Sequence, residues 1–465
     1  MRTYALKKSP GVPLYESLYR AIRADILSGA LAPGEKLPSK RAMAVNLDVS
    51  KITVEAAYGQ LLAEGYLRSV EKVGYFVEQT ERPVLPPQLP LPETTSPPAP
   101  VQEADTGRFP FSVWSRLQRE VMLDYGGRLL QSLPPEGVPE LRRAIAAHLR
   151  DFRGMRVSPE QIVVGAGTDF LCNLLIQLLG REKVYGVEEP GYGKIWKIYR
   201  SGGVRCLAIP MDGRGVMPDR LEGVQVLHIS PSHHFPTGLV TPMSRRQALL
   251  AWASGGTDRW IVEDDYDSEF RFDAHPMPAM ASLDGGRRVI YMNSFSRSLA
   301  PSLRIGYMVL PPELMARFHS SLGFYGSTVA SFEQYTLARF LERGYFEKHI
   351  NRMRKFYRGR RNRILARLER SPLAGRLTVL EQDAGLHFLV KVDTRLTDRE
   401  LEALCARAGL PLRCLSAFYR EGVPEQDRRC LVVRYGELSE QALEKSLEIL
   451  EKAPAESCLF PRPPV

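Results

Sequence analysis

The sequence contains few cysteines and no long apolar run. Its six cysteines show neither paired spacing nor metal-ligand spacing, which argues against a disulfide framework and against a metal site. No stretch of about 18 uncharged apolar residues occurs, and the first residues lack the apolar core of a signal peptide, so we expect no membrane association. These absences favour a reduced, cytoplasmic protein.

Lysine is also scarce. The chain has 14 lysines against 49 arginines, and none of the lysines lies between residues 198 and 347. The net charge is +10, but residues 1–80, with eleven basic and eight acidic side chains, carry only +3 of it. Charge alone is therefore weak evidence for nucleic-acid binding. The 465 residues, 44% hydrophobic and 25% charged, suffice for two or three globular domains.

A proline-rich segment, residues 81–108, divides the chain. It contains eight prolines and almost no apolar periodicity, a composition that favours an extended linker over a packed fold. We therefore expect a small domain over residues 1–80 and a large domain over residues 109–465.

The first 80 residues have the pattern of a winged helix-turn-helix. Apolar residues recur at helical spacing from Leu14 to Ile26, and Ser39 and Ser50 are placed to cap two further helices. Two short strand-like segments, 66–68 and 75–77, then surround a turn. Three helices followed by a hairpin are the outline of this DNA-binding fold.

The large domain alternates differently. Apolar strand-like runs at 162–164, 226–229, 260–262 and 289–292 are separated by helical stretches, which predicts an α/β fold with a mainly parallel sheet over about 150–330. A long helical region follows from Ser331 to Leu368. A smaller α+β part is expected over about 370–455.

The segments 34–41 (GEKLPSKR), 49–54 (VSKITV) and 74–77 (GYFV) resemble the GntR-type regulators, in the right order over about 65 residues. The resemblance implies that Arg41 contacts double-stranded DNA, that Ser50–Thr53 begins the recognition helix and that the wing enters the minor groove. Lys51 stands where the family usually has arginine, which keeps the charge but loses the bidentate geometry. The candidate DNA-binding residues are Ser39, Arg41, Ser50, Lys51, Thr53, Arg68, Lys72 and Gly74.

Five motifs in the large domain resemble the class I aminotransferases of fold type I, which bind pyridoxal 5'-phosphate (PLP). They are 165–168 (GAGT), 189–192 (EPGY), 231–238 (PSHHFPTG), 263–267 (EDDYD) and 294–304 (SFSRSLAPSLR). One departure is Phe235, which occupies the position of an asparagine that bonds the ring hydroxyl in the family.

The resemblance implies a cofactor site built from these motifs. A helix N-terminus with small residues suits a phosphate group, and an aspartate at a strand end pairs with the ring nitrogen. The resemblance favours Asp264 for that role, and the spacing leaves Asp265 as an alternative. For a substrate carboxylate the candidate is Arg434, with Arg429 as its rival. The expected cofactor-binding residues are Gly167, Thr168, Tyr192, Asp264, Tyr266, Ser294, Ser296, Arg297 and Arg304.

Arg297 stands where this family has the lysine that forms a Schiff base with PLP. A guanidinium stays protonated and is not a nucleophile, so it cannot form that bond, and we assign no catalytic residue. Lys194 and Lys197 follow Tyr192, but a Schiff base from there needs a different geometry. Three hypotheses remain: PLP or its amine form binds non-covalently, Arg297 helps to bind another anionic metabolite, or the site is a scaffold for dimerisation.

A GntR-type domain, a linker and an aminotransferase-like domain together resemble the MocR/GabR regulators. The resemblance implies a homodimeric transcription regulator that senses PLP, sometimes with an amino acid as effector. Two alternatives stay open: a PLP-dependent aminotransferase with an appended DNA-binding domain, and a dimeric DNA-binding protein that senses no ligand. Arg297 argues against the aminotransferase, because transamination needs the lysine as anchor and base.

Overall fold

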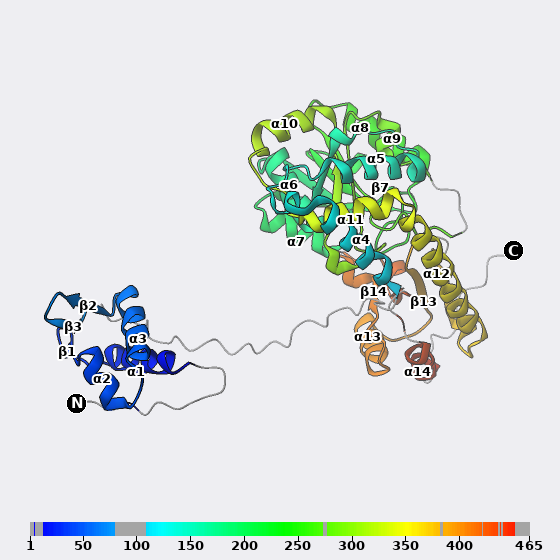
Figure 1. The fold of residues 1–465 in the computed structure, drawn as a ribbon. Coiled ribbons are helices and arrows are strands. Elements are labelled where there is room, and N and C mark those ends of the chain that lie inside the picture. Colours follow the sequence, from blue (N-terminus) through cyan, green and yellow to red (C-terminus); the bar gives the residue numbers. More distant parts are fainter. Residues whose placement is uncertain are drawn as a thin grey trace, which may run out of the picture. The chain divides into compact units, whose positions relative to one another are not determined.

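The computed structural model describes residues 4, 13–79, 108–272, 277–381, 385–420, 422–435, 438 and 440–451. The chain divides into two compact units, Met1–Ala99 and Pro100–Val465, which are considered separately (Figure 1). Most of the segment expected as a linker, residues 81–108, lies outside the described residues.

The first unit is a winged helix-turn-helix, as the sequence predicts. Its three helices enclose a core that includes Leu18, Ile22, Val54, Tyr58 and Leu61. The short strands form an antiparallel sheet in the order β1-β3-β2, and β1 is a strand that the sequence pattern did not indicate. The elements are α1 (Leu14–Ser28), β1 (Lys36–Leu37), α2 (Lys40–Leu47), α3 (Lys51–Ala63), β2 (Leu67–Val70) and β3 (Gly74–Val77).

The second unit is built around an eight-stranded sheet in the order β4-β11-β10-β9-β8-β5-β6-β7. The five strands from β10 to β6 in this order are parallel to their neighbours, while β4, β11 and β7 pair antiparallel. The expected mainly parallel sheet is therefore confirmed. The strands are β4 (Ile162–Gly165), β5 (Val184–Glu189), β6 (Arg205–Asp212), β7 (Gly215–Val216), β8 (Val226–Ile229), β9 (Trp260–Asp264), β10 (Val289–Ser294) and β11 (Gly306–Val309).

Helices cover both faces of this sheet. Neighbouring strand residues such as Ile261 and Val262 belong to different apolar clusters, because successive side chains of a strand point to opposite faces. Burial on both faces explains why these strands are continuous apolar runs. The helices that surround the sheet are α5 (Pro139–Arg153), α6 (Thr168–Leu179), α7 (Gly193–Ser201), α8 (Met243–Ser254), α9 (Met280–Asp284) and α10 (Pro312–Leu322).

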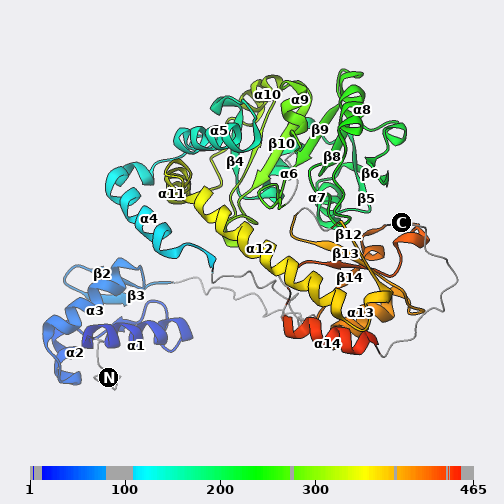
Figure 2. The ribbon, with the colours of Figure 1, turned by 90° about the vertical axis from the view of Figure 1, so that its right-hand side faces the viewer.

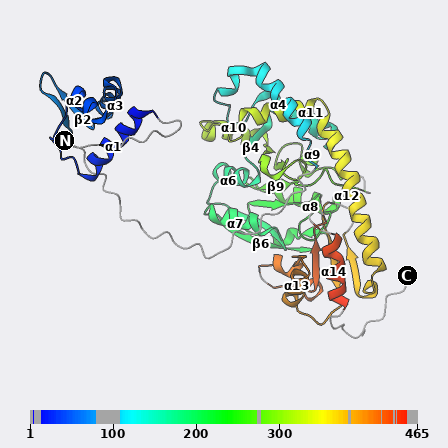
Figure 3. The same cartoon turned by 60° about the horizontal axis from the view of Figure 1, so that its bottom comes forward.

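A long helix, α12 (Tyr345–Arg370), joins the large part of this unit to a smaller one (Figure 2, Figure 3). The helical region expected from Ser331 onward is two helices, α11 (Ser331–Glu342) and α12, separated at Gly344 with φ +70°. Helix α4 (Phe111–Tyr125) packs against α11. The smaller part is an antiparallel sheet with two helices: β12 (Leu377–Leu380), β13 (Phe388–Val392), α13 (Asp398–Arg407), β14 (Arg413–Cys414), β15 (Cys430–Val433) and α14 (Glu440–Glu451).

The sequence predicts no membrane span, no metal site and no disulfide bond, and the described part of the chain bears on each of the three. Within the described ranges, no helix combines the length and the apolar character that a membrane span requires. Among the same residues, no group of three or more metal-ligating side chains is brought together. The five cysteines that lie within the described ranges are all buried and unpaired with one another.

Candidate functional site

A cavity of about 370 Å³ opens in the second unit at the carboxyl ends of its parallel strands. Strands β5, β8, β9 and β10 end beside it. Polar side chains reach the cavity from β5 (Glu188), β9 (Asp264) and β10 (Ser294), and from Ser230, which follows β8. Ligands of open α/β sheets commonly bind at this edge, because loops and helix N-termini converge on it. The remaining lining residues are Thr168, Asp169, Val187, Gly191, Tyr192, Lys194, Ile195, His228, Phe235, Tyr266, Ser296, Arg297, Pro301, Arg304, Arg420 and Arg434.

One corner of the cavity has the donors of an anion site. Helix α6 begins at Thr168, after Gly167 with φ +81°, so its free backbone N–H groups face the cavity. Ser294, Ser296 and Arg304 line the same cavity. The left-handed backbone of Gly167 leaves room for the Arg304 guanidinium, because a Cβ at residue 167 would lie 3.1 Å from its central carbon. The five residues can surround a phosphate-sized group.

Asp169 is a residue of this corner that the sequence motifs did not indicate. Its carboxylate lies 3.0 Å from the Arg304 guanidinium and 2.7 Å from Lys194 Nζ. Burial alone would raise the pKa of Asp169, but the two cations outweigh it and lower that pKa. Asp169 is therefore ionised near neutral pH and holds the same cations that an anionic ligand would use.

Asp169→Asn is expected to tighten the binding of a phosphate-bearing ligand by about fivefold, because the ligand would no longer displace a carboxylate from Arg304 and Lys194. Isothermal titration calorimetry of the full chain with pyridoxine 5'-phosphate measures the change. Asp219→Asn, at an exposed carboxylate outside the cavity, is the matched control. Weaker binding by Asp169→Asn would instead assign Asp169 the role of holding Arg304 in place.

The acidic pair at the end of β9 is divided between two environments. Asp264 lines the cavity, where one carboxylate oxygen lies 3.6 Å from His228 Nε2, and His228 Nδ1 lies 2.7 Å from the Tyr199 hydroxyl. His228 Nε2 is buried and has no hydrogen-bond partner among the described residues. Asp265 does not line the cavity. Its side chain is buried, forms an ion pair of 3.0 Å with Arg153 and accepts a hydrogen bond of 2.6 Å from the Tyr291 hydroxyl.

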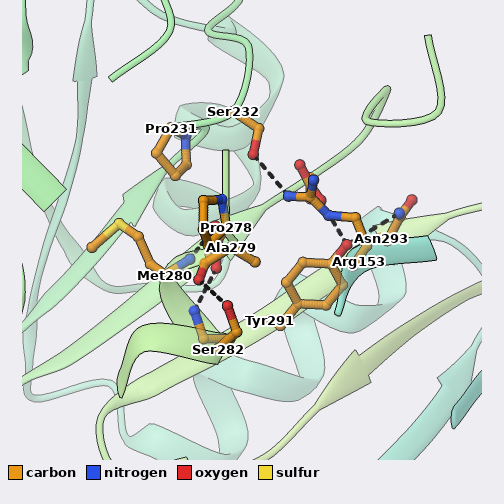
Figure 4. A network of polar contacts seen from close by, with 12 residues as sticks. Arg153, Pro231, Ser232, Pro278, Ala279, Met280, Ser282, Tyr291 and Asn293 are labelled. Carbon is orange, nitrogen blue, oxygen red and sulfur yellow. Dashed lines mark hydrogen bonds and ion pairs between the residues drawn. The ribbon is translucent and has the colours of Figure 1, made fainter. Parts of the chain in front are cut away.

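Figure 4 shows the polar contacts around Arg153, the partner of Asp265 in this ion pair. Arg153 lies between Ser232 and Tyr291 and donates to the Ser232 hydroxyl at 3.2 Å. Burial alone would raise the pKa of Asp265, but Arg153 and the Tyr291 hydroxyl bring it below its usual value. Of these two adjacent acids, Asp264 is therefore the one that a ligand in the cavity can reach.

Tyr266 and Phe235 form the wall beside Asp264. The Tyr266 hydroxyl lies 3.2 Å from His233 Nδ1, which is also 2.8 Å from an Asp267 oxygen. Burial raises the pKa of Tyr266 well above its usual value, so its phenol remains a hydrogen-bond donor. Phe235 packs edge-on against Tyr192, with ring centroids 5.8 Å apart. Tyr192 is 50% exposed, which leaves a ring face available for stacking.

Glu188 is a second residue that the motifs missed. It accepts a hydrogen bond of 3.0 Å from the Ser230 backbone N–H, and an oxygen lies 3.4 Å from His234 Nε2. Burial raises the pKa of Glu188 to about 8, so the carboxyl holds its proton near neutral pH. Its only sequence signal is its place at the end of an apolar strand.

Three arginines complete the lining. Arg297 lies on the turn after β10 with an exposed side chain, and its positive charge opposes the rise in the pKa of Tyr266. Arg420 forms an ion pair with Glu189 and lies over the Trp196 ring at 4.5 Å. Arg434 lines the cavity, whereas its rival Arg429 is paired with Glu425 at 2.8 Å and does not.

The first unit has a second candidate surface, on α2, α3 and the wing. Ser39 and Ser50 cap α2 and α3 by accepting backbone N–H groups, as expected, and Arg41 and Lys51 are exposed in the first turns of these helices. The exposed apolar residue Ile52 stands beside Lys51 and was not among the candidates; an apolar side chain there suits a thymine methyl group.

The remaining candidates of this surface differ in their surroundings. The Thr53 hydroxyl lies 2.8 Å from that of Ser50, so the two hydroxyls are linked at the start of α3. Arg68 contacts Glu78 at 3.5 Å and lies over the Phe76 ring, while Lys72 and Gly74 form the wing turn with positive φ.

Comparisons with known proteins agree with both units. Residues 14–77 match the family of bacterial regulatory proteins, gntR family, and residues 103–431 match aminotransferase class I and II. The chain is similar to the HTH-type transcriptional regulator YhdI of Bacillus subtilis, with 37% identity over 96% of this chain and 97% of the relative. It is 33% identical to the probable rhizopine catabolism regulatory protein MocR of Rhizobium meliloti, over 96% of this chain and 95% of that one.

Two further similarities bear on the large unit. The pyridoxine biosynthesis transcriptional regulator PdxR of Corynebacterium glutamicum is 32% identical over 86% of this chain and 88% of the relative. The crystal structure of kynurenine aminotransferase from Pyrococcus horikoshii in complex with PMP has a TM-score of 0.64 and 25% identity, covering 75% of this chain and 88% of that one.

The fold and these matches define a DNA-binding transcription regulator with an aminotransferase-like domain. The chain belongs to the MocR-type regulators, in which a GntR helix-turn-helix precedes a class I and II aminotransferase domain. The aminotransferase family normally binds PLP.

Proposed function

We propose that this regulator senses PLP, or a closely related phosphorylated metabolite, without a covalent bond, and that ligand binding changes its affinity for DNA. The observation that carries the proposal is the convergence of the motif residues on one cavity. Eight of the nine residues expected from the sequence line it, Gly167 adjoins it, and Arg297 takes the lysine's place among them.

The residues that line the cavity fit PLP. Thr168, Ser294, Ser296 and Arg304 would hold the phosphate at the N-terminus of α6. Asp264 would hold a proton on the ring nitrogen, and when bound the protonated ring supplies an electron sink.

The other walls would fix the ring and its substituents. Tyr192 would stack on one ring face, while Tyr266 would donate to the ring hydroxyl, a contact that Phe235 cannot make. Arg297 and Arg434 add positive charge, which favours a ligand with a carboxylate besides the phosphate. Because a guanidinium forms no Schiff base, affinity would come from these contacts alone.

The DNA-binding surface would be the one on α2, α3 and the wing. Arg41 and Lys51 would contact base edges or phosphates, and Arg68 and Lys72 would reach the backbone from the wing. The N-terminal turns of α2 and α3, capped by Ser39 and Ser50, favour contact with phosphate.

We also propose a homodimer. Helix α4 and the turn after it expose large apolar side chains, with Leu123 77% and Leu130 81% accessible, which suits an interface with a second copy. A dimer would carry two DNA-binding domains and so raise avidity at paired sites.

The double variant Leu123→Glu/Leu130→Glu is expected to weaken the dimer by about 100-fold or more, because two apolar contacts are lost and two charges enter the interface. Analytical ultracentrifugation of the full chain measures the dissociation constant. Leu27→Glu, at an exposed leucine of α1, is the control for added charge. An unchanged dimer would place the interface elsewhere.

The coupling of ligand to DNA tests the proposed function itself. DNA selected from a random library by the full chain is titrated by fluorescence anisotropy, with and without saturating PLP. We expect the DNA affinity to change by about fivefold or more, a typical allosteric coupling. Saturable ligand binding with no change in DNA affinity would contradict the proposed sensing role and would limit the large domain to dimerisation.

A further inference from the structure

A second cavity, of about 320 Å³, lies in the large unit away from the first and shares none of its lining residues. Its walls come from α5, from α11 and α12, and from residue 269, which follows β9. The residues that line it are Ala144, Ala147, His148, Asp151, Phe152, Glu269, Leu341, Glu342, Gly344, Phe346, Glu347, Ile350, Asn351 and Arg354.

Glu269 is a buried carboxyl group in this wall. The residue is 3% exposed, and its Oε2 has no hydrogen-bond partner among the described residues. Its Oε1 accepts a long hydrogen bond of 3.5 Å from Asn293 Nδ2. Burial raises the pKa of Glu269 to about 8, so this carboxyl, like that of Glu188, holds its proton near neutral pH. A cation bound beside it would lower that pKa, and the carboxyl would then release its proton to solvent and become the counter-charge of the cation.

The rest of the lining has an excess of negative charge. Asp151, Glu342 and Glu347 stand at the cavity with exposed side chains. Arg354 is the single cation among the described lining residues, and its Nε is occupied by a hydrogen bond of 2.6 Å to the backbone carbonyl of Glu269. Asp151 is paired with Arg150 at 2.8 Å, so Glu342 and Glu347 are the two exposed carboxylates that face the one guanidinium of the lining, a balance that favours a cationic ligand over an anionic one.

Aromatic side chains supply the apolar part of the cavity. His148 stacks on Phe152 with ring centroids 5.3 Å apart, and its edge meets Phe346 at 5.1 Å. Burial lowers the pKa of His148 to about 4, so its ring is neutral near pH 7 and adds no positive charge. The Arg354 guanidinium also lies over the Phe152 ring, at 5.1 Å, so these rings offer mainly their edges to a hydrocarbon chain, together with Leu341 and Ile350 of the lining.

We propose that this cavity is a binding site for a small organic cation, an aliphatic amine or diamine. One ammonium group would lie against Glu269, whose carboxyl would lose its proton on binding, and the hydrocarbon chain would lie against the edges of Phe152 and Phe346. A second ammonium group would meet the exposed carboxylates at the rim. A bare metal ion fits less well, because no group of three or more ligating side chains converges within the described residues.

A buried polar path leads from this cavity toward the first one. Asn293 contacts Glu269 and the Tyr291 hydroxyl, which donates to Asp265. Figure 4 shows Asn293, Tyr291 and Arg153 side by side. Asn293 and Asp265 adjoin Ser294 and Asp264, which line the first cavity. Amine binding at Glu269 would thus affect ligand binding at the first site through the ends of β9 and β10. This regulatory role rests on the proposed function.

Calorimetric titration of the full chain with 1,4-diaminobutane tests the site, with 1,4-butanediol as the uncharged probe of the same length. The proposal predicts saturable binding of the diamine and none of the diol. Glu269→Gln keeps the shape but cannot ionise beside a bound ammonium group, so affinity is expected to fall by about tenfold or more. Glu369→Gln, at an exposed carboxylate of the same helix as Arg354 but outside the cavity, is expected to bind normally.

Failure of the diamine to bind the natural protein, or equal weakening by the Glu269 and Glu369 variants, would overturn the proposal. Circular dichroism melting reports whether Glu269→Gln folds. If it does not, the exposed rim variants Asp151→Asn and Glu347→Gln replace it, with an expected loss of about threefold each. Diamine binding to a protein that binds no PLP would leave this site standing and overturn the proposed function alone.

Discussion

Arg297→Lys is expected to turn a reversible PLP complex into a covalent one. A lysine amine at this position, at the cavity that Tyr266 and Asp264 also line, can form a Schiff base with the PLP aldehyde, whereas the guanidinium cannot. After borohydride reduction, mass spectrometry should find one PLP-derived adduct per variant chain, on residue 297. The natural protein should carry no such adduct at stoichiometric PLP.

The control for this variant is Arg297→Gln, which removes the charge without adding an amine and should also remain free of adduct. A reduced adduct on the natural protein would contradict the account. Lys194 would then be the first residue to inspect, because it lines the same cavity and its Nζ lies 2.7 Å from Asp169 in the anion corner.

Arg41→Ala is expected to weaken DNA binding by about 30-fold, which corresponds to about 2 kcal/mol. The side chain is exposed in the first turn of α2, where a guanidinium can bond a guanine edge or a phosphate, and either contact is worth about 1–3 kcal/mol. Fluorescence anisotropy with selected DNA, repeated over a range of salt, separates the two roles. A lost phosphate contact lowers the salt slope by about one, and a lost base contact relaxes sequence preference.

Arg20→Ala is the matched control in the same domain. Arg20 is exposed on α1 and pairs with Glu16 at 2.5 Å, so its loss changes the charge equally without touching α2 or α3. Equal weakening by both variants would reduce the role of Arg41 to general electrostatic attraction.

The fold could be predicted from the sequence because its signals are local. The caps at Ser39 and Ser50, the strand-sized apolar runs and the turn glycines each act within a few residues. The break between α11 and α12 was missed, because Arg-rich helical periodicity continues across Gly344 and only the backbone shows its positive φ. Short strands such as β1 and β7, of two residues each, carry too little pattern to be seen.

The candidate site was predictable where a motif encodes it and unpredictable where tertiary contacts decide. Adjacent acids at a strand end look alike in sequence, yet Arg153 and Tyr291 enclose Asp265 and leave Asp264 at the cavity. Asp169 was missed because its partners, Lys194 and Arg304, lie 25 and 135 residues away. The environment of Glu269 also depends on segments far apart in the chain.

The most direct test of non-covalent sensing is a calorimetric titration of the natural protein with PLP and, side by side, with pyridoxine 5'-phosphate, which has no aldehyde. The account predicts saturable binding of both ligands, with affinities within about threefold, because phosphate, ring-nitrogen and stacking contacts are shared and no covalent bond contributes. Binding of PLP alone would show that the aldehyde reacts with another amine. Binding of neither would mean that the cavity does not serve PLP.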